Sequence, residues 1–300
     1  MAVITGPTAS GKTALAIRLA QALGTHVISA DSRQIYRGMP ITTARPSNEE
    51  LSAVPHHFIE TLDIDRYYSA AEYESDVLGL LASGTIPGDT AVMCGGSMMY
   101  VDAVCKGINE MPTISAEVRQ RVVELRKEHG NKGLLAFLEI ADPVSFARVD
   151  LANMRRVMHA IEVTMQAGRP YSELCGKPKT PRPFETVKFM IDLPRERLFE
   201  RINHRVDTMV REGMEEEARR LYPLRHLNSL NTVGLKEWFA HFDGAMDRET
   251  TIARIKKYTR VYAKKQLTWL ARDQSVVRLD PSRDLLEQAM EILQSESPPR

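Results

Sequence analysis

The chain has 300 residues, of which 43% are hydrophobic, and a formal net charge of +1 at pH 7. This length and apolar content are enough for a buried core, arranged as one large domain or two smaller ones. No stretch approaches the ~20 apolar residues of a membrane span and the first residues form no charged leader, so we expect a soluble cytoplasmic protein. Cys94, Cys105 and Cys175 match no metal-ligand spacing and are expected to be reduced, which argues against a zinc enzyme.

A glycine-rich loop lies between the first predicted strand and the first predicted helix. The strand is the apolar run Ala2–Ile4, and apolar residues at helical spacing continue from Ala14 to Leu23. Such a loop presents backbone N–H groups to phosphate oxygens, and the helix N-terminus adds partial positive charge. Lys12 is expected to reach the terminal phosphates and the Thr13 hydroxyl a Mg²⁺ ion. The loop has the spacing G-x-x-x-x-G-K-S/T and consists of Gly6, Pro7, Thr8, Ala9, Ser10, Gly11, Lys12 and Thr13.

The next predicted strand brings an aspartate to the same edge of the sheet. Residues 26–30 are typical of a second strand, and Asp31 follows them where parallel strands deliver ligand-binding residues. A polar, turn-rich loop over residues 33–56, with a short helix near Asn48, is expected to bind a ligand, because connections of this length usually have a function. Another short strand is expected at residues 57–59.

A helix and a third ligand-edge segment follow. Ser69 and Glu72 have the spacing of a capping box ahead of a helix that continues to about Ala82. Residues 91–94 form an apolar strand that ends in Gly95, Gly96 and Ser97, and a helix is expected from residue 98 to residue 106. A glycine pair at a strand end permits close approach of the backbone to a ligand.

The middle of the chain is expected to be a helical insertion. Apolar residues recur at helical spacings over residues 113–175 without a convincing strand, and residues 176–183 form a linker rich in proline and lysine. Residues 187–193 return to a strand pattern. A long helix from residue 195 to about residue 221, bending at Gly213, follows this strand.

The order of these elements predicts an α/β fold. We expect a P-loop NTPase-like parallel sheet flanked by helices, with a helical insertion domain. The catalytic core, which ends in basic helices, is predicted to comprise residues 1–112 and 176–300, and the insertion residues 113–175.

Positive charge is concentrated in residues 250–272. A solvated surface helix usually carries both charge signs, whereas the charged residues here are all basic: Arg254, Lys256, Lys257, Arg260, Lys264, Lys265 and Arg272. At 100° per residue, Ile255, Tyr258, Tyr262 and Trp269 share one face, and Lys257, Arg260 and Lys264 share the opposite one. The first face is predicted to pack and the second to face a polyanion such as a nucleic-acid backbone.

Asp31 has two chemical interpretations that the residues alone leave open. It is the best candidate for the carboxylate that completes a Mg²⁺ shell, and it is equally suited to act as a general base beside a bound phosphate ester. Arg201 and Arg205, four residues apart on the predicted helix, can point the same way and hold a diphosphate. For Arg201, salt bridges with Glu200 or Asp207 are the alternative.

These motifs resemble one family, the tRNA dimethylallyltransferases, through nearly the whole chain. Few other phosphate-loop families share even two of the matching segments, which are residues 6–13, Asp31–Tyr36 with Gly38 and Met39, Pro55–His57, Tyr68–Ala70, Gly95–Tyr100, Arg201–Ile202 with Arg205–Val206, Val233–Gly234 and Lys264–Leu270. The resemblance implies transfer of the dimethylallyl group from dimethylallyl diphosphate to N6 of adenosine 37, next to the anticodon of tRNA, with release of diphosphate.

The resemblance also implies roles for the site residues. The phosphate loop holds the diphosphate of dimethylallyl diphosphate rather than ATP, and Asp31 accepts the N6 proton or holds the amine in line. Lys12, Arg205 and a Mg²⁺ ion held by Thr13 and the diphosphate stabilise the leaving group. The adenine has to be flipped out to reach the site. The insertion at residues 113–175 is expected to contact the anticodon stem-loop.

The tRNA-binding residues implied by the resemblance are Asp31, Ser32, Arg33, Gln34, Ser97, Arg119, Arg155, Arg156, Val157, Met158, His159, Asn231, Thr232, Val233, Gly234, Leu235, Lys236, Lys264, Lys265, Gln266, Leu267, Thr268, Trp269, Leu270 and Ala271. Three of them depart from the family's pattern. Ser97 replaces the usual Thr and keeps its hydroxyl, whereas His159 and Lys236 stand where Arg is common. Lys236 lacks the planar fork of Arg, which puts its RNA contact in doubt.

Two readings from other classes remain open. A small-molecule kinase would use the loop for ATP and Mg²⁺ but has no use for the basic segment at 250–272. An RNA-binding ATPase would use Asp31 only as a metal ligand. The expected partners are tRNA and dimethylallyl diphosphate, with no membrane, and we expect a monomer.

Overall fold

The computed structural model describes residues 1–109, 111–175 and 181–296, and divides the chain into two compact units. Unit 1 comprises Met1–Cys105 and Arg182–Arg300, and unit 2 comprises Lys106–Pro181. Residues 176–180 of the predicted linker lie outside the described residues. In the part of the chain that is described, no helix is long and apolar enough to cross a membrane.

Unit 1 is built on a parallel sheet of six strands in the order β3-β2-β4-β1-β5-β6. The predicted α/β class is therefore confirmed. The register pairs Ala2 with Val92 on one side and with Val187 on the other, so the first strand lies inside the sheet. The strands are β1 (Ala2–Thr5), β2 (Val27–Ser29), β3 (His56–His57), β4 (Val92–Gly95), β5 (Val187–Ile191) and β6 (Val276–Leu279), the last of which was not predicted.

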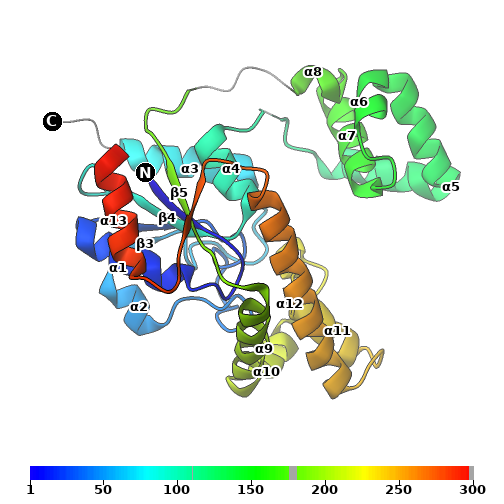
Figure 1. Cartoon of the computed structure of the whole chain (residues 1–300). Helices are drawn as coiled ribbons and strands as arrows, with labels where there is room; N and C mark the ends of the chain where they lie inside the picture. The colour runs from blue at the N-terminus through cyan, green and yellow to red at the C-terminus, as the bar shows by residue number, and fades with distance from the viewer. Residues whose placement is uncertain (110, 176–180, 297–300) are drawn as a thin grey trace. The chain divides into compact units, whose positions relative to one another are not determined.

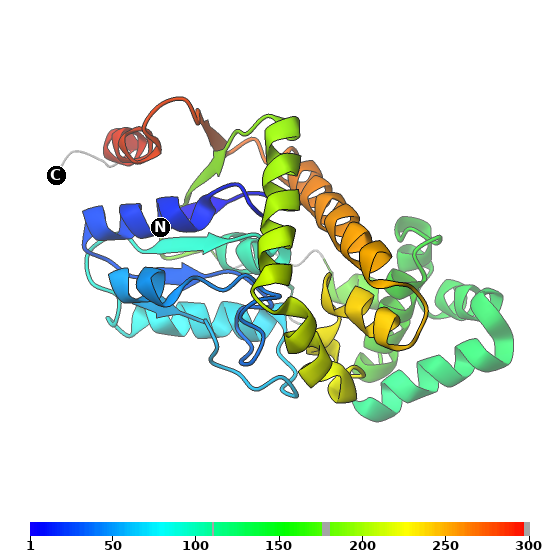
Figure 2. The same cartoon turned by 90° about the horizontal axis from the view of Figure 1, so that it is seen from below.

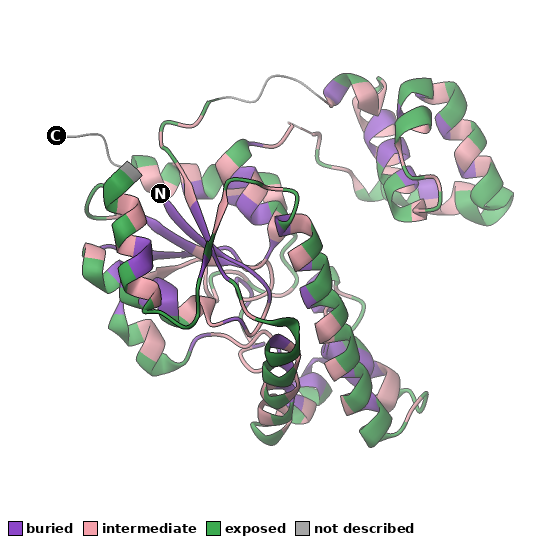
Figure 3. Cartoon of the chain, viewed as in Figure 1, coloured by how far each residue is buried: buried purple, intermediate pink, exposed green. Residues whose placement is uncertain are grey.

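Side chains of each strand alternate between the two faces of the sheet, and both faces are apolar. Helices therefore cover both faces (Figure 2). Ala2 and Ile4 pack against α1 (Lys12–Leu23) and α13 (Leu285–Glu296), whereas Val3 packs on the side of α3 (Ala70–Ala82) and α4 (Met98–Lys106). The central strands are buried on both faces, and the covering helices expose their outer sides (Figure 3). This arrangement leaves the strand ends free to carry a site.

Local capping chemistry sets two of the helix starts. The Ser69 hydroxyl accepts from the N–H of Glu72, and the Glu72 carboxylate accepts from the N–H of Ser69, which confirms the predicted capping box. Ser47 and Glu50 form the same reciprocal pair ahead of α2 (Asn48–Ala53). Each cap satisfies two N–H groups that the first turn would otherwise leave without partners.

The second half of unit 1 forms a helical layer beside the sheet edge. It contains α9 (Arg195–Arg211), α10 (Met214–Leu221), α11 (Leu235–Phe242) and α12 (Arg248–Leu270), together with short 3₁₀ turns at Tyr222–Leu224 and Asn228–Leu230. The single bent helix predicted across Gly213 is wrong. Gly213 has φ +100°, a conformation that ends α9 and starts α10 as a separate helix.

Unit 2 consists of helices, and none of its described residues belongs to a strand. The helices are α5 (Ala116–Ala141), α6 (Pro143–Arg148), α7 (Met154–Ala167) and α8 (Tyr171–Leu174), and Gly130 interrupts α5 with φ +66°. Leu134, Val157 and Ile161 are fully buried in its core. The buried Asp142 carboxylate accepts bonds from the N–H and hydroxyl groups of Ser145 and Ser172, which ties α6 to α8.

Candidate active site

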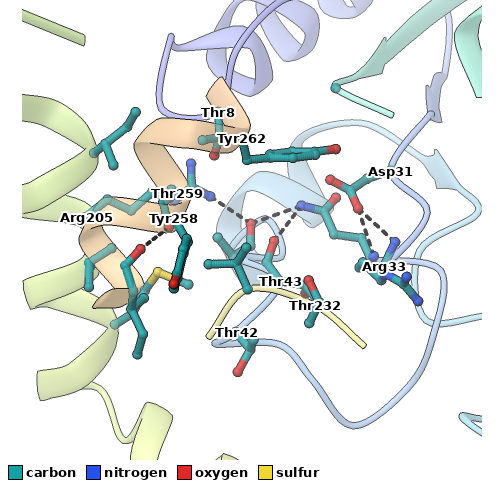
Figure 4. A pocket seen from close by; sticks show the side chains of 18 of the residues that line it. Thr8, Asp31, Arg33, Thr42, Thr43, Arg205, Thr232, Tyr258, Thr259 and Tyr262 are labelled. Carbon is teal, nitrogen blue, oxygen red and sulfur yellow. Dashed lines mark hydrogen bonds between the residues drawn. The ribbon is translucent and has the colours of Figure 1, made fainter. Parts of the chain in front are cut away.

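A cavity of about 710 Å³ opens in unit 1 at the carboxyl ends of β1, β2 and β4. The loop after each of these strands lines it, and α9, α10, α11 and α12, with the segment that leads into α11, supply the remaining wall (Figure 4). The carboxyl edge is where open parallel sheets bind ligands, since successive loops converge there. The cavity therefore brings together the phosphate loop, Asp31 and the Gly95–Ser97 turn.

The phosphate loop has the backbone that its spacing predicts. Gly6 has φ +140° and Gly11 has φ +102°, conformations that residues with a side chain rarely adopt. Ala9 has φ +63° despite its side chain, a strained conformation of the kind that clusters at ligand sites. The helix α1 starts at Lys12, so its first N–H groups have no partners within the helix and are available to an anion.

Lys12 and Arg205 place half-buried positive charge beside this loop. The Lys12 Nζ donates to the carbonyl oxygen of Pro7 at 2.7 Å, and burial lowers the pKa of Lys12 to about 8. Burial likewise lowers the pKa of Arg205, whose guanidinium donates to the carbonyl oxygen of Ala44 at 3.2 Å. A Cβ on Gly11 would meet the Arg201 guanidinium at 3.5 Å. All three predicted cations thus lie around the phosphate loop.

Asp31 is held by the turn that it starts. Its Oδ1 accepts from the backbone N–H groups of Arg33 at 2.8 Å and Gln34 at 3.3 Å. The next residue, Ser32, donates its N–H to the Ser97 hydroxyl at 2.8 Å, and the Ser97 hydroxyl donates to that of Ser32 at 3.1 Å. Figure 4 shows the carboxylate of Asp31 facing the cavity. The orientation of this carboxylate is fixed before any ligand arrives.

Arg33 and Gln34 hold the walls of the cavity together. The Arg33 guanidinium donates to the carbonyl oxygens of Asn228 and Ser229. The Gln34 amide donates to the carbonyl oxygens of Thr43 and Ala44, both at 3.1 Å. Both residues line the cavity, and their donor groups are already used within the chain.

The glycine pair at the end of β4 lies close to other parts of the chain. A Cβ on Gly95 would lie 2.1 Å from the carbonyl oxygen of Ala30, and one on Gly96 would lie 2.3 Å from Nε2 of Gln266. Position 95 therefore requires glycine because the backbone of Ala30 approaches it, whereas a side chain at position 96 would displace the amide of Gln266. Both glycines also line the cavity, and close approach of a ligand to them stays a prediction.

The two faces predicted for the basic segment are partly reversed in α12. Tyr258 and Tyr262, expected to pack, are each 38% exposed and line the cavity. Arg260, expected to face outward, donates to the Asn203 side chain on α9, and Lys264 lies over the ring of Phe199. The reason is that α12 packs on α9 through Ala263 and Leu267, which turns the tyrosines into the cavity. Burial and the charge of Asp31 raise the pKa of Tyr262 to about 12.

Five of the predicted tRNA-binding side chains, including that of Ser97, are buried. Val157 and Leu235 are fully buried, and Gln266 and Leu270 are 2% and 4% exposed. The side chains of Val157, Leu235 and Leu270 pack inside the protein, whereas Gln266 also lines the cavity; their contact with tRNA stays a prediction. The exposed members of the set are Asn231, Lys236, Lys264, Lys265, Thr268 and Ala271 in unit 1, and Arg119, Arg155, Arg156 and His159 in unit 2. Ser32, Thr232, Val233, Leu267, Trp269 and Met158 are half-buried, whereas Ser97 and Gly234 are buried.

Two residues that contribute to the site, Glu217 and Tyr262, were not predicted as site residues from the sequence. The Glu217 carboxylate, 5% exposed on α10, accepts from the N–H groups of Ile41 and Thr42 and so shapes the loop that carries Thr43 and Ala44. No local signal marks Glu217. Tyr262 could have been found, because it lies four residues before Gln266 and so shares a helix face with a residue of the family motif.

The residues present fit a Mg²⁺ ion that arrives with a phosphate compound. The Thr13 hydroxyl belongs to the cavity lining beside Lys12, and the buried Ser10 hydroxyl has no hydrogen-bond partner in the described structure. The described residues contain no cluster of three or more His, Cys, Asp or Glu that could hold a metal alone. Mg²⁺ commonly keeps few protein ligands and completes its shell with phosphate oxygens and water.

Comparison with known proteins is consistent with this site. The family model described as IPP transferase matches residues 34–273. The chain is 44% identical to tRNA dimethylallyltransferase 1 of Phocaeicola vulgatus, over 97% of this chain and 96% of that one. It is 46% identical to tRNA dimethylallyltransferase 2 of Parabacteroides distasonis, over 94% of each. The crystal structure of tRNA isopentenylpyrophosphate transferase from Bacillus halodurans aligns with a TM-score of 0.69 at 33% identity, covering 98% of this chain and 94% of that chain.

Proposed function

The chain belongs to the IPP transferase family, and from this premise we propose that it transfers the dimethylallyl group of dimethylallyl diphosphate to N6 of adenosine 37 in tRNA. The observation that carries the proposal is the shared cavity, in which Asp31 faces the same space as Lys12 and Thr13. A small-molecule kinase would have no use for the exposed basic residues of α12, and an RNA-binding ATPase would use Asp31 only as a metal ligand. An acceptor that binds between the phosphate loop and the fixed carboxylate of Asp31 explains why both line the same cavity.

The donor diphosphate binds at the phosphate loop. The N–H groups at the start of α1, together with Lys12 and Arg205, supply donors and positive charge around it. These groups are fixed by the fold and partly shielded from water, so they stabilise negative charge more strongly than they would in water. Since the diphosphate gains charge as it leaves, they lower the barrier to departure.

The reaction is a substitution at the allylic carbon. The N6 lone pair forms a bond to C1 of the dimethylallyl group while the C1–O bond breaks, and diphosphate departs with that electron pair. The N6 proton passes to Asp31, whose Oδ1 is anchored by two backbone N–H groups. A Mg²⁺ ion, when bound by Thr13 and the diphosphate, supplies further charge neutralisation for the leaving group.

The RNA side of the proposal rests on the exposed basic residues. Lys257, Lys264 and Lys265 of α12 are exposed in unit 1, and Arg155 and Arg156 of α7 are exposed in unit 2. Such residues bind phosphates without reading sequence, and the target adenine is flipped out of the anticodon loop into the cavity. We propose that unit 2 contacts the anticodon stem-loop. We also propose that the protein works as a monomer, and in the cytoplasm, where it meets its tRNA acceptor.

The direct test combines the purified protein, dimethylallyl diphosphate, Mg²⁺ and tRNA that lacks modification at adenosine 37. Nucleosides from the digested tRNA are then analysed by mass spectrometry. The expected product is adenosine carrying one dimethylallyl group on N6, and its formation should need the diphosphate donor but not ATP. Consumption of ATP without a change in the mass of the nucleoside would contradict the proposal and favour the kinase or ATPase reading.

A further inference from the structure

Gln266 joins two of the loops that line the cavity. Its Oε1 accepts from the backbone N–H of Thr8 in the phosphate loop at 3.0 Å, and its Nε2 donates to the carbonyl oxygen of Gly96 at 2.8 Å. The residue is 2% exposed, so both bonds are shielded from water. One side-chain amide thus spans the loop after β1 and the turn after β4.

Each end of this connection leads to a reacting group. On one side, Thr8 belongs to the loop that starts the helix carrying Lys12. On the other side, Gly96 is followed by Ser97, whose hydroxyl bonds to Ser32, the neighbour of Asp31. The amide therefore lies between the phosphate-binding loop and the carboxylate that faces the acceptor.

The chain leaves a fitted space for this amide. A Cβ on Gly96 would lie 2.3 Å from Nε2 of Gln266, so only glycine admits the side chain in this position. The neighbouring Ala9 has φ +63°, which means that the phosphate loop holds a strained conformation one residue from the Thr8 bond. A strained loop keeps its shape only where surrounding contacts determine it, and Gln266 supplies one such contact.

The helix that carries Gln266 is itself anchored to the core of unit 1. The indole N–H of Trp269 donates to the Asp102 carboxylate on α4 at 3.0 Å. Just beyond α12, Asp273 forms a 2.7 Å ion pair with Lys188, which is 4% exposed in β5. An amide on such a fixed element can determine the position of a loop rather than follow it.

We propose that Gln266 is a positioning residue, which holds the phosphate loop and the Gly95–Ser97 turn at the separation that sets the bound diphosphate against Asp31. The proposal rests on the function proposed above, but it concerns how the donor is held. It reassigns Gln266 from a contact with tRNA to a contact within the protein. Loss of the amide disturbs diphosphate binding and the chemical step, and leaves tRNA affinity unaltered.

The test measures inorganic diphosphate binding by calorimetry in the full-length protein with Mg²⁺, so it does not depend on prenyl transfer. Gln266→Met keeps the length of the side chain and removes both hydrogen bonds. We expect the Kd for diphosphate to rise about tenfold, which corresponds to about 1.4 kcal/mol, and the Kd for unmodified tRNA to change by less than about twofold. In activity assays kcat should fall as well.

Gln288 provides a matched control outside the cavity. It is 7% exposed in α13, and its amide likewise bonds at both ends to the backbone, to the N–H and carbonyl of Asp280. Each substitution removes the hydrogen bonds that a buried side-chain amide makes at both of its ends, so Gln288→Met should lower the melting temperature by about as much as Gln266→Met does. Unlike Gln266→Met, it should leave the Kd for diphosphate unchanged. If Gln266→Met behaves in the same way as this control, Gln266 has only a structural role and the proposal is wrong.

Gln266→Glu allows a second measurement, the pH dependence of diphosphate affinity. This dependence would not change if Gln266 had a purely structural role. The carboxylate can still accept from Thr8, but its second oxygen faces the Gly96 carbonyl oxygen and repels it. Protonation restores a donor at that position, and burial raises the pKa of such a carboxyl. Diphosphate affinity relative to the native protein should therefore recover as the pH is lowered from about 8 to about 6. The assignment would be overturned if the ratio of the diphosphate Kd of Gln266→Glu to that of the native protein did not vary with pH. It would also be overturned if the variant lost tRNA affinity and bound diphosphate normally.

Discussion

The backbone N–H of Arg33 donates a 2.8 Å hydrogen bond to Oδ1 of Asp31. This bond fixes the orientation of the carboxylate and stabilises the turn that follows Asp31. A substitution that keeps a hydrogen-bond acceptor at this position should therefore preserve the turn. Asp31→Asn preserves the acceptor oxygen but cannot take a proton. We expect kcat to fall by ~10²–10⁴-fold, the usual contribution of a general base, while tRNA affinity stays within about twofold. Single-turnover kinetics and tRNA binding assays check this, and full transfer by Asp31→Asn would show that Asp31 is not the base.

Lys12 should make donor binding depend on pH. Its pKa is lowered to about 8, so the unliganded protein loses this charge as the pH rises above about 8, and affinity for dimethylallyl diphosphate should fall. Calorimetric titrations without tRNA across this range measure the effect. Lys12→Arg is the control. Because arginine stays charged in this range, the affinity of this variant for dimethylallyl diphosphate should not decrease as the pH rises.

The same titration has the opposite effect on stability. Between pH 8 and the ordinary lysine value of 10.5, the unfolded chain holds a proton that the folded protein has released. The free energy of unfolding should therefore receive a contribution from Lys12 that increases with pH across this window. Urea denaturation of the native protein and of Lys12→Met, which lacks the titrating group, would isolate the contribution by difference.

Tyr262 should matter for the acceptor rather than for the donor. Its ring is 38% exposed in the cavity beside Asp31, and an aromatic face at that place can stack on a flipped adenine, an interaction worth ~1–3 kcal/mol. We expect Tyr262→Ala to raise the KM for tRNA about tenfold or more and to leave the Kd for dimethylallyl diphosphate unchanged, with Tyr262→Phe close to the native protein. Loss of activity in Tyr262→Phe would instead indicate a role for the hydroxyl.

The basic residues of α12 should separate into two groups. Lys257 is exposed, whereas Arg260 is half-buried and bonded to Asn203. Lys257→Glu should weaken tRNA binding and reduce the slope of log K against log salt by about one, with little change in the melting temperature. Arg260→Glu should lower the melting temperature because it removes a link between α12 and α9. An unchanged salt slope for Lys257→Glu would remove that residue from the RNA interface.

The sequence predicted those parts of the site that depend on local pattern. The phosphate loop, the strand before it and the Ser69 capping box are short-range signals, and all three occur where expected. Helical periodicity showed which side chains of α12 share a face but not what each face meets. The direction of Tyr262 depends on how α12 packs on α9, and the roles of Gln266, Gln34 and Glu217 depend on partners far away in the sequence. Gly213 was expected to bend a helix because its φ angle cannot be read from its neighbours.

The central position of β1 has a consequence for the order in which the chain can fold. Ala2 pairs with Val187, so the strand that leads into the phosphate loop gains its second neighbour only after β5 has been synthesised. By then the helices of unit 2, whose contacts are close in sequence, can already have formed. The phosphate loop therefore leaves the ribosome before β5 and becomes fixed late. A nascent chain released before Ile191 should remain unable to bind diphosphate, however complete its unit 2 is.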